Sequence, residues 1–331
     1  MKKYLLGLVI VISCFLLVGC GEYGEKNVLK DLEKKISNSK AYHLTGILEM
    51  INNENSYIYD VEVSYRKDDN FRVSLINQTN NHEQIILKNE NGVYVLTPSL
   101  NKSFKFQSEW PYNNSQAYLL QTILKDIKND KKRTFKKSDD EYVFFTTVNY
   151  PNNKNLVKQK VILDKKVNLK EVQVLDENDN MQMKMTFEKI DLKATYDDNY
   201  FSLKENMESA IALEETVSKI DDIIYPLYIP ENTTLASQNK ITKADGERVI
   251  LTFSGDKSFT FVQETISVSD DLVTIPMYGE PTVVGDTIGA LSETSITWMS
   301  NGMEYYLTSK ILTEDELVNI ASSISTVPVM K

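Results

Sequence analysis

Cysteine and histidine are nearly absent from this chain. Among 331 residues there are 2 cysteines, Cys14 and Cys20, and 2 histidines, His43 and His82. After residue 20 the chain therefore has no thiol for a disulfide, a zinc site or a nucleophile. Two isolated histidines, with no serine or carboxylate pattern beside them, also make a histidine-dependent triad or a histidine-rich metal site hard to assemble. The sequence predicts a fold stabilised by its core alone, with no cofactor, no metal and no catalytic residue.

Long hydrophobic runs are also scarce, and the one that exists is short. It extends from Leu5 to Val18 behind Lys2 and Lys3, whereas a membrane-spanning helix needs about 20 apolar residues. It ends in Leu17-Val18-Gly19-Cys20, which resembles the lipobox of bacterial lipoproteins. The resemblance implies a signal peptide over residues 1–19, a diacylglycerol (palmitate-type) anchor on Cys20 and a lipidated tether over residues 20–26. The protein would then lie on the outer, extracytoplasmic face of the cell membrane, and an uncleaved anchor, the alternative, would leave it at the same face.

Basic residues are too few to balance the acidic ones. The chain has 37 lysines and arginines against 47 aspartates and glutamates, for a net charge of −10. An acidic chain gains nothing from a phosphate backbone, so nucleic acid is excluded as a partner. The same charge predicts repulsion from anionic lipid headgroups, and so a body held off the membrane surface.

The first half of the remaining chain alternates between strand and helix patterns. Apolar residues at helical spacing predict a helix over residues 25–39, and a second one over 115–129 with Ser115 as its N-cap. Period-2 alternation predicts strands, and Asn91-Gly92 predicts a hairpin turn between two of them. The predicted strands cover residues 57–66, 71–75, 88–96, 142–148, 156–163, 170–175 and 181–190.

The second half starts anew after an acidic stretch. Pro226 and Pro230 mark the start, strands are predicted at 249–253, 259–263, 295–299 and 304–307, and Thr313 with Glu316 forms a capping-box pattern before a closing helix. The expected domains are 1–19 signal peptide, 20–26 tether, 27–205 curved β-sheet domain, 206–222 linker and 223–331 small α+β domain.

Shape patterns in the first half resemble the LolA/RseB lipoprotein-carrier fold. They are the first helix, the strand that begins at Tyr42, "NGVYVLTPSLNK" (91–102), the helix after Pro111 and the closing "YDDNYFSL" (196–203). In the second half, "ITWMSNGMEYYL" (296–307) and the helix after it resemble a small domain of envelope and sporulation lipoproteins. The whole order resembles YdcC-type sporulation lipoproteins and GerS-related germination lipoproteins. It implies an α+β fold: a curved antiparallel half-barrel plugged by helices, followed by a smaller α+β domain.

No catalytic signature accompanies these patterns. "DENDN" (176–180) begins like a calcium loop, but Met181 stands where that loop requires glycine, so a polar turn is predicted. We therefore expect a non-enzymatic protein. A hydrolase built on Asp/Glu pairs stays open as an alternative, because spacing alone never excludes it.

The apolar face of the curved sheet is the candidate binding surface. Aromatic and methionine side chains make an adaptable surface for an acyl chain or for a partner's apolar segment. Two readings stay open: the face binds a lipid or lipoprotein ligand or an envelope or spore protein, or helices fill it and it is core. In the second case the chain is a protein-interaction module of the RseB or GerS type. The candidate residues are Tyr57, Tyr59, Tyr65, Phe71, Met183, Met185 and Phe187.

Overall fold

The fold is α+β, with one large curved sheet and one smaller sheet. The computed structural model describes residues 23–52, 55–208, 219–266, 272–300 and 302–324. The expected signal peptide and the expected lipid attachment point, Cys20, lie outside these ranges. None of the helices in the described part of the chain has the length and the apolar character that a membrane crossing requires. The helices are α2 (Glu25–Ser37), the 3₁₀ turn η1 (Pro98–Leu100), α3 (Leu120–Asn129), α4 (Leu203–Glu208) and α5 (Glu314–Ser322).

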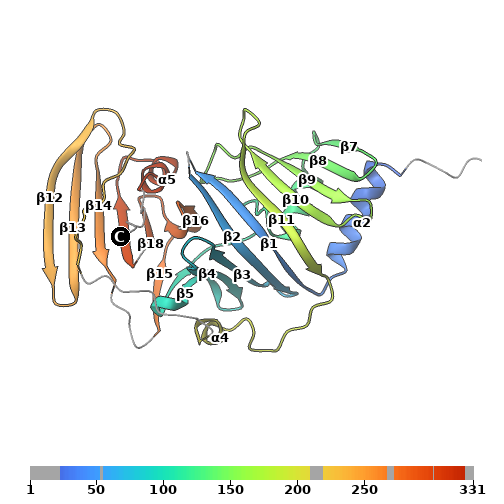
Figure 1. The fold of residues 1–331 in the computed structure, drawn as a ribbon, viewed down its shortest axis with the longest axis horizontal. Coiled ribbons are helices and arrows are strands. Elements are labelled where there is room, and N and C mark those ends of the chain that lie inside the picture. Colours follow the sequence, from blue (N-terminus) through green and yellow to red (C-terminus); the bar gives the residue numbers. More distant parts are fainter. Residues whose placement is uncertain (1–22, 53–54, 209–218, 267–271, 301, 325–331) are drawn as a thin grey trace, which may run out of the picture.

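Within the described ranges, twelve strands form the large sheet, in the order β15-β6-β5-β4-β3-β2-β1-β11-β10-β9-β8-β7. Eleven come from the first half of the chain and pair antiparallel with their neighbours. The sheet curves around a core and stays open, because β15 and β7 are not paired with each other (Figure 1). Its strands are β1 (Ala41–Asn52), β2 (Asn55–Arg66), β3 (Asn70–Asn77), β4 (Glu83–Asn89), β5 (Gly92–Thr97), β6 (Lys102–Phe106), β7 (Thr134–Lys137), β8 (Glu141–Thr147), β9 (Lys158–Asp164), β10 (Leu169–Leu175), β11 (Met181–Asp191) and β15 (Val273–Met277).

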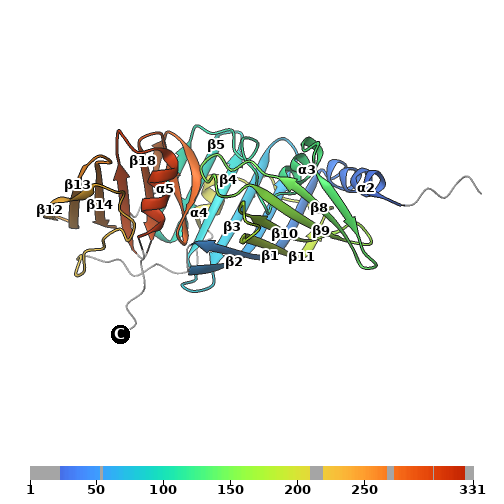
Figure 2. The same cartoon turned by 90° about the horizontal axis from the view of Figure 1, so that it is seen from above.

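The smaller sheet is antiparallel and has seven strands in the described residues, with α5 packed against it. Figures 1 and 2 show α2 and β12 at opposite ends of an elongated molecule. Apolar side chains such as Phe261 and Trp298 stack in the core of the smaller sheet. Burying each large side chain of this kind stabilises the fold by about 1.5–3 kcal/mol. The strands are β12 (Thr233–Lys243), β13 (Gly246–Gly255), β14 (Phe259–Thr265), β16 (Glu280–Val284), β17 (Thr287–Leu291), β18 (Ser295–Ser300) and β19 (Met303–Thr308).

Several local predictions are confirmed. Helix α2 begins at Glu25, the β4–β5 hairpin turns before Gly92, and α5 carries the complete capping box of Thr313 and Glu316. The residues of "DENDN" form a turn in which the Asp176 carboxylate accepts the backbone N–H groups of Asn178 and Asn180.

The start of α3 was predicted wrongly. The helix begins at Leu120, five residues after the Ser115 expected to cap it. Ser115 instead pairs with Asn149: its backbone N–H donates to the Asn149 carbonyl, and its hydroxyl accepts the Asn149 N–H at 2.9 Å. A serine hydroxyl that can cap a helix can also accept a backbone N–H at the end of a neighbouring strand. Ser115 forms this second kind of hydrogen bond.

Strands β6, β7, β12, β15, β16 and β17 were missed. Residues 234–242 of β12 are all exposed, so no alternation marks the strand, while all five residues of β17 are buried. Strand β15 lies in the second half of the chain yet pairs parallel with β6 in the first sheet. Pairing between such distant segments leaves no local trace in the sequence. The predicted domain boundaries stay a prediction.

Candidate ligand cavity between the two sheets

Two helices fill one end of the curved sheet's inner face. Helices α2 and α3 contact each other, and their apolar stripes pack against inward-facing strand residues in a single core. A helix of this kind is amphipathic because only one side meets the sheet. The inserted residues are Val28, Leu32 and Ile36 of α2 and Leu120, Ile123 and Ile127 of α3.

The other end of the inner face is not filled. A cavity of about 510 Å³ lies there, between the large sheet and the edge of the small one. Cavities of about 300–1,000 Å³ are typical of small-molecule sites. One wall comes from the large sheet, with Leu48, Met50, Tyr59, Leu75 and Ile86; the opposite wall comes from β16, β17 and α5, with Pro281, Val283, Ile288 and Val318.

The lining carries no charge. None of its 30 described residues is Asp, Glu, Lys, Arg or His, although 25% of the whole chain is charged. Around the apolar walls lies a rim of amides and hydroxyls, which offers hydrogen bonds without a formal charge. The rim consists of Asn114, Gln116, Asn152, Asn153, Asn155, Gln182, Asn319, Ser322 and Ser323.

Two tyrosine hydroxyls in the lining are buried and donate to no acceptor in the described structure. They belong to Tyr59 on β2 and Tyr150 in the loop after β8. Burial raises the pKa of both phenols well above the ordinary value, so both stay protonated and able to donate. A buried hydroxyl without a partner costs about 1–3 kcal/mol, so a ligand that accepts from it would recover that energy.

Gln84 holds the two walls of the cavity together. Its side chain is buried on β4, and its carbonyl oxygen accepts the Ile288 N–H at 2.6 Å and the Thr287 hydroxyl at 2.9 Å. Its amide nitrogen donates back to the Ile288 carbonyl at 3.1 Å. One side chain thus satisfies a stretch of β17 backbone and fixes the distance between the two sheets at the cavity.

The seven candidate residues do not act as one surface. Tyr59 and Met183 line the cavity, whereas Phe71, Met185 and Phe187 are buried in the core. Tyr57 and Tyr65 are half-buried and pack against that core. Residue alternation identified the inward face, but it missed the rim amides and Gln84, which lie mostly in loops without a periodic signal. The ligand-binding role of the seven residues stays a prediction.

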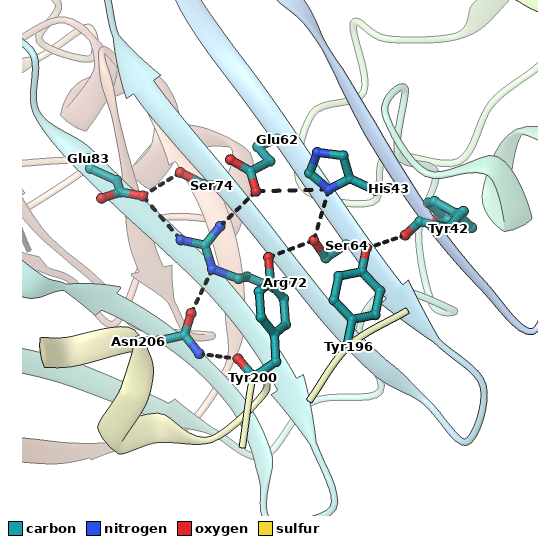
Figure 3. Close-up of polar contacts among 10 residues, drawn as sticks. All are labelled: Tyr42, His43, Glu62, Ser64, Arg72, Ser74, Glu83, Tyr196, Tyr200 and Asn206. Atoms are coloured by element: carbon teal, nitrogen blue, oxygen red, sulfur yellow. Dashed lines mark hydrogen bonds and ion pairs between the residues drawn. The ribbon is translucent and has the colours of Figure 1, made fainter. Parts of the chain in front are cut away.

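A second polar cluster lies on the outer face of the same strands (Figure 3). His43 was expected to stand alone, and that expectation was wrong: its Nδ1 lies 3.4 Å from the Ser64 hydroxyl and 3.9 Å from a Glu62 oxygen. Antiparallel pairing of β1 with β2 sets His43 opposite Ser64. Both contacts use the same ring nitrogen, whereas a triad needs one nitrogen for the serine and the other for the carboxylate. Ser64 is also fully buried under Tyr200, so the trio has no nucleophile accessible to a substrate.

Arg72 is the centre of this outer cluster. Its guanidinium donates to the Asn206 side chain at 2.6 Å and lies 3.4 Å from Glu83 and 3.9 Å from Glu62. Asn206 belongs to α4, at the end of the segment 196–208, which we call the strap. Tyr196 and Tyr200 of the strap also bond the sheet, at the Tyr42 carbonyl and the Ser64 hydroxyl (Figure 3). The cluster therefore fastens the strap to the sheet.

Comparison with known proteins identifies the family. No protein-family model matches the chain. The sporulation protein YdcC of Bacillus subtilis (strain 168) is 35% identical over 327 residues, which cover 98% of this chain and 97% of that protein. The chain belongs to the YdcC family.

Solved structures with similar folds are more distant. The Pseudomonas aeruginosa MucA/MucB complex contains a chain with a TM-score of 0.34 and 10% identity, and the match covers 89% of this chain and 98% of that one. The LolA superfamily protein NE2245 of Nitrosomonas europaea has a TM-score of 0.32 and 9% identity, over 54% of this chain and 98% of its own. Scores this low carry no inference about ligand or partner for a YdcC-family chain.

Proposed function

We propose that this YdcC-family chain is a non-enzymatic binding protein, anchored by lipid at Cys20 to the outer face of the cell membrane. We further propose that it acts in spore or envelope assembly; its Bacillus subtilis relative is named a sporulation protein. Its cavity would hold a ligand that is partly apolar and carries no net charge, such as the acyl portion of a lipid or lipoprotein.

The uncharged lining is the observation that carries this proposal. An ionised ligand group without a counter-ion pays a large desolvation cost, so a cavity without charged residues disfavours it. Apolar walls accept hydrocarbon, and the rim amides with the Tyr59 and Tyr150 hydroxyls can bond ester, amide or hydroxyl groups. General acid–base catalysis needs a titratable group near its working pH, and the only titratable groups in the described lining are tyrosine phenols, of which burial raises the pKa of Tyr59 and Tyr150 further.

A matched pair of substitutions tests the ligand. Val283→Trp would fill the cavity from β16, where the valine is 40% exposed, whereas Val273→Trp adds the same ring on β15 at a residue that is 38% exposed and outside the lining. We expect a fluorescent monoacylglycerol to bind the native chain and Val273→Trp but not Val283→Trp. Equal binding by all three, or by none, would contradict the cavity as the ligand site.

The anchor is tested separately. Cys20→Ala should abolish incorporation of a labelled fatty acid into the protein in cells and leave the precursor unprocessed. Labelling that persists in the variant would show that Cys20 is not the attachment point.

A protein partner is the second candidate function, and a different surface favours it. Leu227 is 81% exposed, and its neighbours Tyr225, Tyr228 and Ile229 are also exposed, which makes a contiguous apolar segment of a kind often found at interfaces. Tyr228 also lines the cavity, so a partner bound here would lie at its mouth. In this alternative function, the small sheet would brace the large sheet and offer the surface that binds the partner. If Leu227→Asp impairs sporulation while Val283→Trp does not, this alternative gains over the ligand proposal.

A further inference from the structure

Lysines from two distant segments gather around the first described residue of the chain. Tyr23 lies in a shallow surface hollow with Lys34 and Lys35 of α2, and with Lys165 and Lys166 of the β9–β10 turn. The ring of Tyr142 lies 5.8 Å from that of Tyr23 and completes the hollow. We call these six residues the tether-end surface, because the proposed anchor Cys20 precedes Tyr23 by three residues.

Three acidic groups at this end are already engaged. The Tyr23 hydroxyl donates to Asp31. Glu25 and Glu33 are paired with Arg133 and Lys128. The Lys35 ammonium donates to the carbonyls of Lys166 and Val167 and to the Asn168 side chain. The hollow thus contains four lysines and one aspartate.

The opposite end of the molecule has the opposite charge. The described residues between 219 and 324, which contribute the small sheet, include 14 acidic and 6 basic residues. Net charge alone predicted repulsion from an anionic membrane, but that charge is concentrated far from the tether: Figures 1 and 2 show the small sheet and α2 at opposite ends. An uneven charge distribution of this kind orients a protein in the field of a charged surface.

Three residues span at most about 11 Å of extended chain, so an anchored Cys20 would hold Tyr23 close to the lipid headgroups. The surface potential of an anionic leaflet decays over a Debye length of about 8–10 Å at physiological salt. The four lysines would therefore lie within its range, and the small sheet would not. Tyrosines such as Tyr23, which is 37% exposed, are also enriched at membrane interfaces.

We propose that the tether-end surface docks on anionic lipid headgroups of the bilayer that anchors Cys20, and so holds the molecule upright with the small sheet and the cavity turned away from the membrane. The inference rests on the proposed lipid anchor. It assigns Lys34, Lys35, Lys165 and Lys166 to a phosphate-bearing surface, and it predicts an orientation that a flexible tether alone would not impose.

The test uses the lipidated full-length protein, reconstituted into vesicles of phosphatidylcholine alone or with phosphatidylglycerol. An amine-reactive label is read by mass spectrometry at Lys26 and Lys165, with exposed Lys204 on α4 as the internal reference. We expect phosphatidylglycerol to protect Lys26 and Lys165, and about 1 M salt, where the Debye length is about 3 Å, to remove the protection.

Two double variants with equal charge changes separate the causes. Lys34→Gln/Lys166→Gln should lower the ratio of docked to undocked protein by roughly tenfold or more, since each lysine near an anionic surface contributes appreciably. Lys219→Gln/Lys310→Gln, away from the tether end, should leave it unchanged. Equal protection on both kinds of vesicle, or equal loss in both variants, would overturn the proposal while the anchor stands. Absence of fatty-acid label at Cys20 would overturn the anchor and, with it, this inference.

Discussion

Strands β2 and β3 have two faces with different environments. Their inward residues, such as Val63, Phe71 and Val73, are buried and apolar, and this side continues into the open cavity at Tyr59 and Leu75. Their outward residues are Glu62, Ser64, Arg72 and Ser74, and the strap bonds two of them, Ser64 and Arg72. The alternation of side chains along a strand produces both faces at once. The alternation does not show which segment covers each face. Whether a face is covered or left open decides whether it can bind a ligand.

The largest expected effect is at the filled part of the inner face. Phe71 is fully buried, with ring centroids of Tyr65 and Trp110 at 4.9 and 5.9 Å. Phe71→Ala should lower the free energy of unfolding by about 3–5 kcal/mol in urea denaturation. The control Ile58→Ala removes a 37% exposed side chain from β2 and should cost less than about 1 kcal/mol. A small loss at Phe71 with lost ligand binding would show that this part of the face is open.

The second-largest loss of stability is expected at the outer face, where the Arg72 side chain holds the polar contacts together. Arg72→Met leaves Glu83, Glu62 and the Asn206 side chain without their shared partner, which should cost about 2–3 kcal/mol. Amide hydrogen exchange in α4 should rise at the same time, because Asn206 fastens that helix. Lys158→Met is the control, since Lys158 pairs at 2.6 Å with the exposed Asp179, outside the strap. If α4 keeps its protection in Arg72→Met, the strap is held by its apolar contacts instead.

A half-buried carboxyl on α3 gives a pH dependence. Burial raises the pKa of Asp126 on α3 to about 6, although Ser115 and Gln159 bond it. The folded state then binds a proton that the unfolded state releases near pH 4, so the contribution of Asp126 to stability is present below pH 4 and lost as pH rises to about 6. Asp126→Asn should raise stability at pH 7 by about 1–2 kcal/mol and flatten the curve between pH 4 and 6. An unchanged profile in the variant would contradict the raised pKa.

The smallest expected change in stability comes from removing a single tyrosine hydroxyl, either in the cavity or in the core of the small sheet. Tyr59→Phe and Tyr305→Phe each remove a buried hydroxyl with no partner in the described structure, so each should raise stability by about 0.5–1 kcal/mol. Tyr305 lies in the core of the small sheet, whereas Tyr59 lines the cavity. Ligand should therefore stabilise native protein and Tyr305→Phe more than Tyr59→Phe, as measured by thermal unfolding. An equal shift in all three would mean that the ligand does not bond the Tyr59 hydroxyl.

Much of the fold could be predicted because it depends on local patterns. Alternation along β2 and β3, the apolar stripe of α2 and the Thr313–Glu316 capping box each repeat within a few residues, so the sequence alone identifies them. Strand β12 could not be found, because neither of its faces is buried, so its sequence has no reason to alternate between apolar and polar residues. Strand β15 and the His43–Ser64 contact could not be found either, since both depend on pairing between segments that are distant in the chain.

By itself the sequence determined the fold class, the two faces of each strand, the near absence of reactive thiols and the candidate anchor at Cys20. Only the tertiary structure decided that α2 and α3 fill one end of the inner face and leave a cavity at the other. It also decided that Gln84 joins the two sheets and that four lysines meet beside Tyr23. The physical reason is the same in each case. Local patterns record which side of an element avoids water, whereas a cavity or a charged surface depends on which elements meet in space.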